Sequence, residues 1–179
     1  MADKKLNEGL GYGQIELNQC AFRRDGRIEA QCKIEGADYV ENGMILAIDN
    51  TKREVRYPAA SDYMFGLNYT SEHMYDERLV GGLKYYKTDK DSFLPRLGYL
   101  AVGDKFTTNT VVYDDAADIT TMVYGYVKAE DKNDYKGYIR LSATEPNDAI
   151  AGAPLLRVID AKATMPNGAP AVKFQCIKA

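Results

Sequence analysis

The side chains that most often carry enzymatic chemistry are few in this chain, and their spacing does not suit catalysis. His73 is the one histidine among 179 residues, so a Ser-His-Asp relay or a histidine metal cluster would depend on it alone. Neither a Gly-x-Ser-x-Gly elbow nor a His-Glu-x-x-His motif occurs. We therefore interpret His73 as a loop residue that is solvated or hydrogen-bonded to its neighbours.

Two acidic clusters have the residue types to bind calcium or to hydrolyse a glycoside. Tyr135 follows the second cluster and stands where a calcium loop needs its fifth-position oxygen ligand, and no glutamate closes that loop. We interpret the first cluster as a solvated turn and the second as a polar hairpin tip. We expect no metal and no cofactor. The clusters comprise Asp114, Asp115 and Asp118 in the first, and Asp131, Asn133 and Asp134 in the second.

The three cysteines, Cys20, Cys32 and Cys176, are odd in number and form no Cys-x-x-Cys pair, which is typical of reduced thiols. Cys32 falls on an apolar strand face, and Cys176 sits beside Phe174 in the same way. A role in packing follows for both. A hydrolase that uses Asp or Cys residues is the weakest of three hypotheses, and we expect a protein that is not an enzyme and has no catalytic residues.

Charge and hydropathy exclude two classes of partner. Lys and Arg number 23 against 26 Asp and Glu, and no basic block occurs, so we expect no nucleic-acid binding. The longest apolar run, 44–48, is far shorter than the roughly 20 residues that span a bilayer, so we expect no membrane partner. The N-terminus lacks the apolar region of a signal peptide, which favours residence in the cytoplasm where the chain is made.

The first 13 residues have a composition typical of a flexible arm. Glycine occupies alternate positions from 9 to 13, and apolar content is low. No strand precedes these glycines and no helix follows them, so a phosphate-binding loop is disfavoured. We expect this arm to bind a partner by lying along it, and its larger apolar side chains are the candidate contacts: Leu6, Leu10 and Tyr12.

Alternation of apolar and polar residues predicts that most of residues 14–179 are β-strands. Turn sequences such as Asp25-Gly26 and Asn167-Gly168 separate the strands. The fold expected is all-β with room for a minor helix, as a compact barrel or sandwich of about eight to ten short strands, with an added lobe after about residue 114 as an option. Further β-rich runs are 119–128 and 138–143, and the predicted pairs are 15–17 with 28–34, 43–48 with 53–57, 97–102 with 106–112, and 156–165 with 171–177.

One stretch, 74–106, contains the residues that we expect to act as a structural clasp. A Gly-Asp turn would bring 97–102 against 106–112, aromatic side chains would hold the long preceding loop on the sheet, and an arginine would pair with an acidic residue of that loop. The predicted clasp residues are Tyr75, Asp76, Glu77, Phe93, Arg96, Tyr99, Gly103, Asp104 and Phe106.

The order of these residues, together with Val40-Glu41-Asn42-Gly43-Met44 and Arg53-Glu54-Val55 upstream, resembles a group of small virion proteins of tailed bacteriophages that are encoded beside the major capsid gene. The resemblance covers roughly residues 28–110. It implies a capsid decoration, or cement, protein that binds the outside of the head shell in many copies and bridges its subunits. The implied partner is the major capsid protein, self-association is left open, and the implied location is the virion surface.

A second hypothesis is a ligand- or carbohydrate-binding β module of a phage tail, fibre or neck. The chain has 14 tyrosines and no tryptophan. Tyrosine is common on half-exposed strands and at interfaces, and exposed tyrosines form platforms for ligands. The candidate platform residues are Tyr63, Tyr69, Tyr85 and Tyr86.

Overall fold

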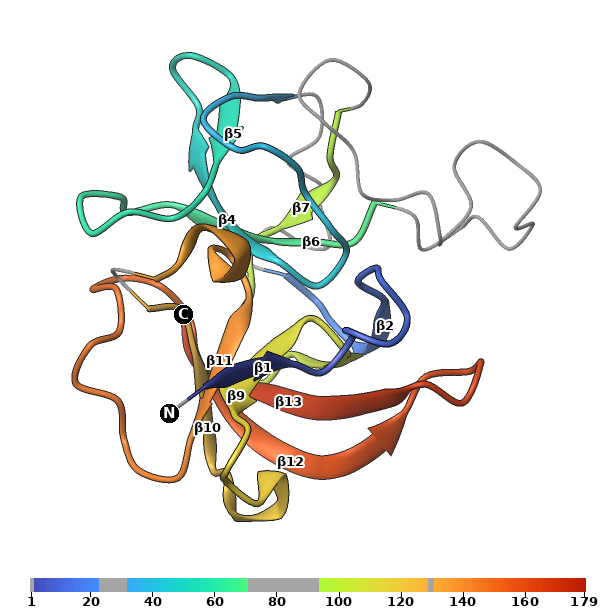
Figure 1. The fold of residues 1–179 in the computed structure, drawn as a ribbon. Helices are drawn as coiled ribbons and strands as arrows, with labels where there is room; N and C mark the ends of the chain where they lie inside the picture. Colours follow the sequence, from blue (N-terminus) through green and yellow to red (C-terminus); the bar gives the residue numbers. More distant parts are fainter. Residues whose placement is uncertain (1, 23–31, 71–93, 129–130) are drawn as a thin grey trace.

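The computed structural model describes residues 2–22, 32–70, 94–128 and 131–179. Within these residues, thirteen strands form an eight-stranded sheet and a five-stranded sheet (Figure 1). The helical content of the described residues is limited to two single 3₁₀ turns, η2 (Ile119–Thr121) and η3 (Asn133–Tyr135). The predicted all-β fold is confirmed.

The larger sheet curls into a half-barrel and is antiparallel except where β11 runs parallel to β9. Strands that follow residue 114 lie between strands that precede it, so the later part of the chain shares this sheet and does not build a sheet of its own. The order across the sheet is β1 (Asp3–Lys5), β9 (Val111–Asp114), β11 (Ile139–Ser142), β10 (Tyr124–Tyr126), β12 (Leu155–Thr164), β13 (Pro170–Lys178), β8 (Lys105–Thr108) and β2 (Ile15–Gln19).

The smaller sheet contains the predicted hairpin of 43–48 with 53–57. Here β4 pairs antiparallel with β5, and β3 pairs parallel with the far side of β5. The order across the sheet is β3 (Lys33–Ile34), β5 (Glu54–Arg56), β4 (Ile45–Asp49), β6 (Phe65–Asn68) and β7 (Leu97–Gly98).

Strand β4 is buried on both faces, as its uninterrupted apolar sequence predicts. Ile45 and Ala47 point into one hydrophobic cluster, which also contains Phe106 from the larger sheet. The alternate residues Leu46 and Ile48 point into a second cluster. Because successive side chains of a strand face opposite sides, this single strand connects two cores.

The predicted hairpin of 156–165 with 171–177 is confirmed by the pairing of β12 with β13. Val172, Phe174 and Cys176 are all fully buried, as their alternation predicts. Gly168 has a φ of 82°, a conformation that glycine adopts without strain.

The outer half of this hairpin projects beyond the rest of the sheet (Figure 1). Strand β10 pairs with β12 only at Leu156 and Arg157, and β8 reaches no further along β13 than Val172. Two β-bulges interrupt the outer half of β12, one between Val158 and Asp160 and one between Asp160 and Ala163.

The Gly103-Asp104 turn does not form the predicted hairpin. Strand β7 pairs with β6 in the smaller sheet, whereas β8 pairs with β13 and β2 in the larger one, so the turn carries the chain from one sheet to the other. The predicted strand 106–112 is also divided at Asn109 and Thr110 into β8 and β9. A Gly-Asp turn reverses the chain locally, but it does not determine which sheet the next strand joins. The predicted pair of 15–17 with 28–34 does not form among the described residues, because β2 pairs with β8 in the larger sheet and β3 pairs with β5 in the smaller one. The predicted turn at Asp25-Gly26 lies outside the described residues.

Residues 2–13 are packed against the sheet, which differs from the flexible arm expected. Asp3 to Lys5 form β1 and pair with β9, and the amide of Leu6 donates a hydrogen bond to the Val111 carbonyl at 2.9 Å. Leu6 packs on the first hydrophobic cluster, Leu10 is half-buried and Tyr12 is 9% exposed. The segment is held by residues distant in sequence, which its own composition does not show.

Candidate functional site

The predicted clasp residues divide into three sets in the structure. Tyr75, Asp76, Glu77 and Phe93 lie outside the described residues. Gly103 and Asp104 form the turn between the sheets, and Phe106 lies in the core. Arg96 and Tyr99 flank β7. The described members therefore do not gather around one point.

Among the described members, Asp104 accepts three hydrogen bonds through its side chain. Its carboxylate is 4% exposed and accepts hydrogen bonds from the amides of Ala21 at 2.8 Å, Phe22 at 3.2 Å and Ala101 at 2.9 Å. These bonds join the turn to the segment that follows β2. Phe22, which has a φ of 54°, then stacks on Tyr69 with the ring centroids 5.4 Å apart. Asp104 holds two distant segments together, so its role is structural.

Phe106, Tyr99 and Arg96 also contribute to the fold. Phe106 is fully buried, with its ring centroid 5.6 Å from that of Phe174. Tyr99 is 6% exposed, and its hydroxyl accepts a hydrogen bond from Asn50 Nδ2 at 3.3 Å. The amide of Arg96 donates to Thr70 Oγ1 at 2.7 Å. The acidic partners predicted for Arg96 are not among the described residues.

A polar cluster that the sequence did not reveal lies beneath the N-terminal segment. The Glu41 carboxylate is 1% exposed and accepts hydrogen bonds from Tyr138 Oη at 2.8 Å and Asn7 Nδ2 at 3.1 Å. Burial, and then the charge of Glu41, raises the pKa of the Tyr138 hydroxyl. Tyr138 therefore stays protonated as a hydrogen-bond donor. A cavity of about 320 Å³ adjoins this cluster.

Lys5 lies among three tyrosines beside that cavity. Its Nζ is 4.5 Å from the ring centroid of Tyr138, 5.8 Å from that of Tyr135 and 6.0 Å from that of Tyr39, and it donates to Tyr39 Oη at 3.4 Å. Such cation–π contacts stabilise a charged amine where water is partly excluded. Burial raises the pKa of the Tyr57 hydroxyl, which donates to the Tyr39 carbonyl, to about 12.

Arg140 attaches β1 to the loop that precedes β11. Its guanidinium donates to both carboxylate oxygens of Asp3, at 3.0 and 3.2 Å, and to both of Asp131, at 2.8 and 3.1 Å. The hydrogen bond from Arg140 lowers the pKa of Asp3. The Asp131 carboxylate, which the sequence placed at a polar hairpin tip, is therefore part of a half-buried ion network.

The remaining candidate residues lie in turns, in the core or outside the described residues, with the exception of Tyr63. Asp114 and Asp118 each accept a backbone amide two residues onward, as in the solvated turn expected. Cys32 and Cys176 are buried. His73, Tyr85 and Tyr86 lie outside the described residues. Tyr69 is 4% exposed and is not a surface platform.

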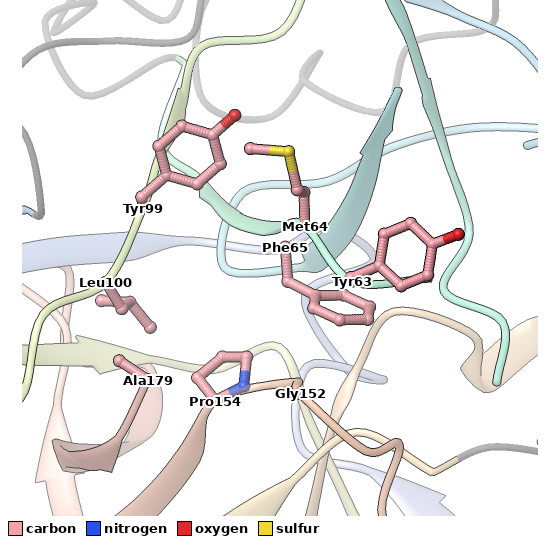
Figure 2. Close-up of a pocket in the computed structure, with 8 residues that line it drawn as sticks. All are labelled: Tyr63, Met64, Phe65, Tyr99, Leu100, Gly152, Pro154 and Ala179. Atoms are coloured by element: carbon pink, nitrogen blue, oxygen red, sulfur yellow. The ribbon is translucent and has the colours of Figure 1, made fainter. Parts of the chain in front are cut away.

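Tyr63, in contrast, is 88% exposed and borders a pocket at the junction of the two sheets (Figure 2). The pocket has a volume of about 110 Å³. Figure 2 shows Tyr63 and Tyr99 on opposite sides, with Met64 and Phe65 between them. The opposite wall and the floor come from segments beside β7, β12 and β13, through Leu100, Gly152, Pro154 and Ala179.

The described residues contain neither a group of three or more His, Cys, Asp or Glu side chains that could hold a metal ion, nor a helix long and apolar enough to cross a membrane. Comparison with protein-family models, with curated proteins and with solved structures finds no match to this chain.

Proposed function

We propose that this chain is a non-enzymatic structural protein of a tailed-phage virion, which binds the outer surface of the capsid and bridges neighbouring subunits. The sequence resemblance in 28–110 supplies the class of partner, the major capsid protein. The observation that carries the proposal is the projecting outer half of the β12–β13 hairpin, because an arm that extends from the body can reach a second subunit.

The outer half of the hairpin has surface that the fold itself does not use. From Arg157 to Thr164 every residue is half-buried or exposed, and Ile159 is a large apolar residue that is 46% exposed. Asp160 and Lys162 are exposed near it. An apolar residue with charges of both signs around it is typical of a contact that is weak alone. Many such contacts on a repeating shell add to firm attachment.

The N-terminal segment has a different role in this proposal from the one its sequence suggested. Its side chains contact Arg140 and Glu41, and its Leu6 amide donates to the Val111 carbonyl, so we assign it to the stability of the body. Capsid contact is assigned to the hairpin.

Co-sedimentation with capsids tests the proposal. Expanded shells assembled from the major capsid protein of the same genome are mixed with wild-type protein and with an Ile159→Asp, Lys162→Glu variant. We expect the wild type to sediment with the shells and the variant to bind at least about tenfold more weakly, because a charge replaces the apolar contact. Both substitutions are at exposed positions, so circular dichroism should show an unchanged fold.

Val102→Asp is the matched control, since Val102 is 68% exposed and lies in the turn between β7 and β8, which contacts the inner half of the hairpin at Cys176 and not the outer half. It should bind like the wild type. Failure of the wild-type protein to sediment with the shells would overturn the capsid proposal, and equal binding by the hairpin variant would remove the hairpin from it.

A further inference from the structure

The dipeptide Asn-Gly occurs at Asn42-Gly43 and at Asn167-Gly168. An asparagine in this dipeptide is prone to lose its side-chain amide as ammonia, because the following glycine has no side chain to hinder its own backbone nitrogen. That nitrogen lies close to the asparagine Cγ along the chain, and such proximity favours an intramolecular attack that closes a cyclic imide. The fold places the two dipeptides in different surroundings.

The reaction needs water as its only co-reactant. The glycine nitrogen loses its proton to solvent and bonds to the asparagine Cγ, and the Cγ–Nδ2 bond breaks as ammonia leaves. Water then opens the imide at one of its two carbonyl groups. Opening at the side-chain carbonyl gives aspartate, and opening at the backbone carbonyl gives isoaspartate, in which the chain continues through the former side chain. An amide and water thus become a carboxylate and ammonium, with no oxidation or reduction.

The local backbone geometry of the two sites is closely matched. Gly43 has a φ of 84° and Gly168 a φ of 82°. The Gly43 amide donates to the Asn68 carbonyl and the Gly168 amide donates to the Met165 carbonyl, both at 2.8 Å. Because each nitrogen is held in a hydrogen bond, each turn must open before its nitrogen can attack. The free energy of that opening therefore decides which site reacts.

Opening is costly at Asn42, because this turn is part of the core. Asn42 is 0% exposed, and its carbonyl accepts a hydrogen bond from the Thr110 hydroxyl. Gly43 is packed so closely that a Cβ atom there would overlap Thr108 Oγ1. All residues from 40 to 48 are buried. Release of this turn would expose the interior, so we expect it only with extensive unfolding.

Opening is easier at Asn167, which lies at the tip of the projecting hairpin (Figure 1). Pro166, Asn167 and Gly168 are all exposed, and a Cβ atom at Gly168 would meet nothing within 4 Å. The hydrogen bonds described for this turn join residues within 165–169, so the tip can open while both sheets stay intact. The Ala169 amide also donates to Asn167 Oδ1 at 3.1 Å, which polarises the carbonyl that is attacked.

We propose that Asn167 is a site of spontaneous conversion to aspartate and isoaspartate in the folded protein, and that burial protects Asn42 from the same reaction. Either product places a negative charge at the hairpin tip. Isoaspartate also adds a carbon atom to the backbone of the turn. The inference rests on the two Asn-Gly turns alone and is independent of the capsid contact assigned to the hairpin.

Peptide mapping of the purified full-length protein tests the proposal. The folded protein is incubated in mildly alkaline buffer, sampled over time and digested at acid pH, and each asparagine is followed by mass spectrometry. Conversion raises the peptide mass by about 1 Da, and chromatography separates the aspartate and isoaspartate forms. We expect Asn167 to react at least about 100-fold faster than Asn42, because only the tip opens without loss of the core.

Two controls separate the fold from the dipeptide. In concentrated guanidinium chloride the two sites should react at rates within about threefold of each other, because the unfolded chain no longer protects Asn42. Asn167→Gln keeps an amide at the tip but lengthens the side chain, so it should remove the conversion there while circular dichroism shows an unchanged fold. If Asn167 reacts no faster than Asn42 in the folded protein, or if the difference persists in guanidinium chloride, the proposal is overturned.

Discussion

Asp104 concentrates three backbone hydrogen bonds on one buried carboxylate. Asp104→Ala should therefore leave the amides of Ala21, Phe22 and Ala101 without this acceptor, and Phe22 is buried, so water cannot readily replace the carboxylate there. We expect the free energy of unfolding to fall by about 3 kcal/mol, since each unsatisfied buried group costs about 1–3 kcal/mol and partial relaxation recovers some of it. Urea denaturation measures the change.

Asp118→Ala is the matched control for that substitution. Asp118 also accepts a backbone amide, from Thr120 at 2.9 Å, but in an exposed turn where water can replace it. Its cost should stay below about 1 kcal/mol. If both substitutions lower the free energy of unfolding equally, burial of the Asp104 carboxylate does not increase its contribution to stability.

Asp3 gives the fold a dependence on acid pH. Arg140 lowers the pKa of Asp3 in the folded state below its ordinary value of 3.8. The stability from this ionised contact is fully present above the unfolded-state pKa and is lost as pH falls through the folded-state pKa. We therefore expect Asp3→Asn to lower the urea midpoint at pH 7 and to approach the wild-type midpoint near pH 3.

Asp115→Asn serves as the comparison, because Asp115 forms an exposed ion pair with Lys4 at 3.3 Å. Exposed pairs of this kind contribute little to stability, so this variant should match the wild type at both pH values. A difference between wild type and Asp3→Asn that stays constant from pH 7 to pH 3 would contradict the role given to the Asp3 charge.

At the scale of the element, the N-terminal segment is the clearest test of what holds the sheet edge. Leu6 donates its amide to the Val111 carbonyl, and Asp3 and Asn7 are held by Arg140 and Glu41. We expect the Leu6 amide to exchange with deuterium at least about 100-fold more slowly than in an unfolded chain. Hydrogen exchange followed by NMR measures this rate. If the Leu6 amide exchanges as fast as in an unfolded chain, the interpretation of this segment as a flexible arm would be supported instead.

The same segment shows why part of the fold could not be predicted. Alternation correctly placed Phe174 and Cys176 on a buried face, because that pattern is local to the strand. The residues that hold Asp3 and Asn7 are 137 and 34 positions away in sequence. The glycine content of 9–13 can be read from the segment's own sequence, whereas its distant hydrogen-bond partners cannot.

The candidate site was equally hidden. The sequence could identify Tyr63 as a candidate platform residue, because exposed tyrosines commonly contact ligands. Its pocket, however, is built from four separate segments, at 63–65, 99–100, 152–154 and 179. Their meeting depends on the chain crossing between sheets at Gly103, where the sequence suggested a simple hairpin.

At the scale of the whole molecule, β4 makes the two sheets interdependent. Ile45 and Leu46 are neighbours in sequence, are fully buried, and belong to different hydrophobic clusters. We expect calorimetry to show one unfolding transition. Ile45→Ala and Leu46→Ala should each lower the midpoint temperature of this transition and reduce the free energy of unfolding by about 2–5 kcal/mol. Neither substitution should split the transition into two.

Far-ultraviolet and near-ultraviolet circular dichroism provide the second measurement for these variants. The backbone signal and the tyrosine signal should be lost together on heating. Two transitions, or signals that separate in the Leu46→Ala variant, would mean that the clusters unfold independently and that β4 does not couple them.

The bulges of β12 affect how copies of this protein behave when they are crowded. Beyond Arg157 the outer edge of β12 is not covered by β10, and a regular edge of this kind is a template for another strand. The bulges interrupt the regular row of backbone hydrogen-bond donors and acceptors along this edge. In addition, the Lys162 amide already donates a hydrogen bond to Asp160 Oδ1 at 2.9 Å. This edge of β12 is therefore a poor template for a strand of a second molecule, and the hairpin can project with little tendency to seed fibres.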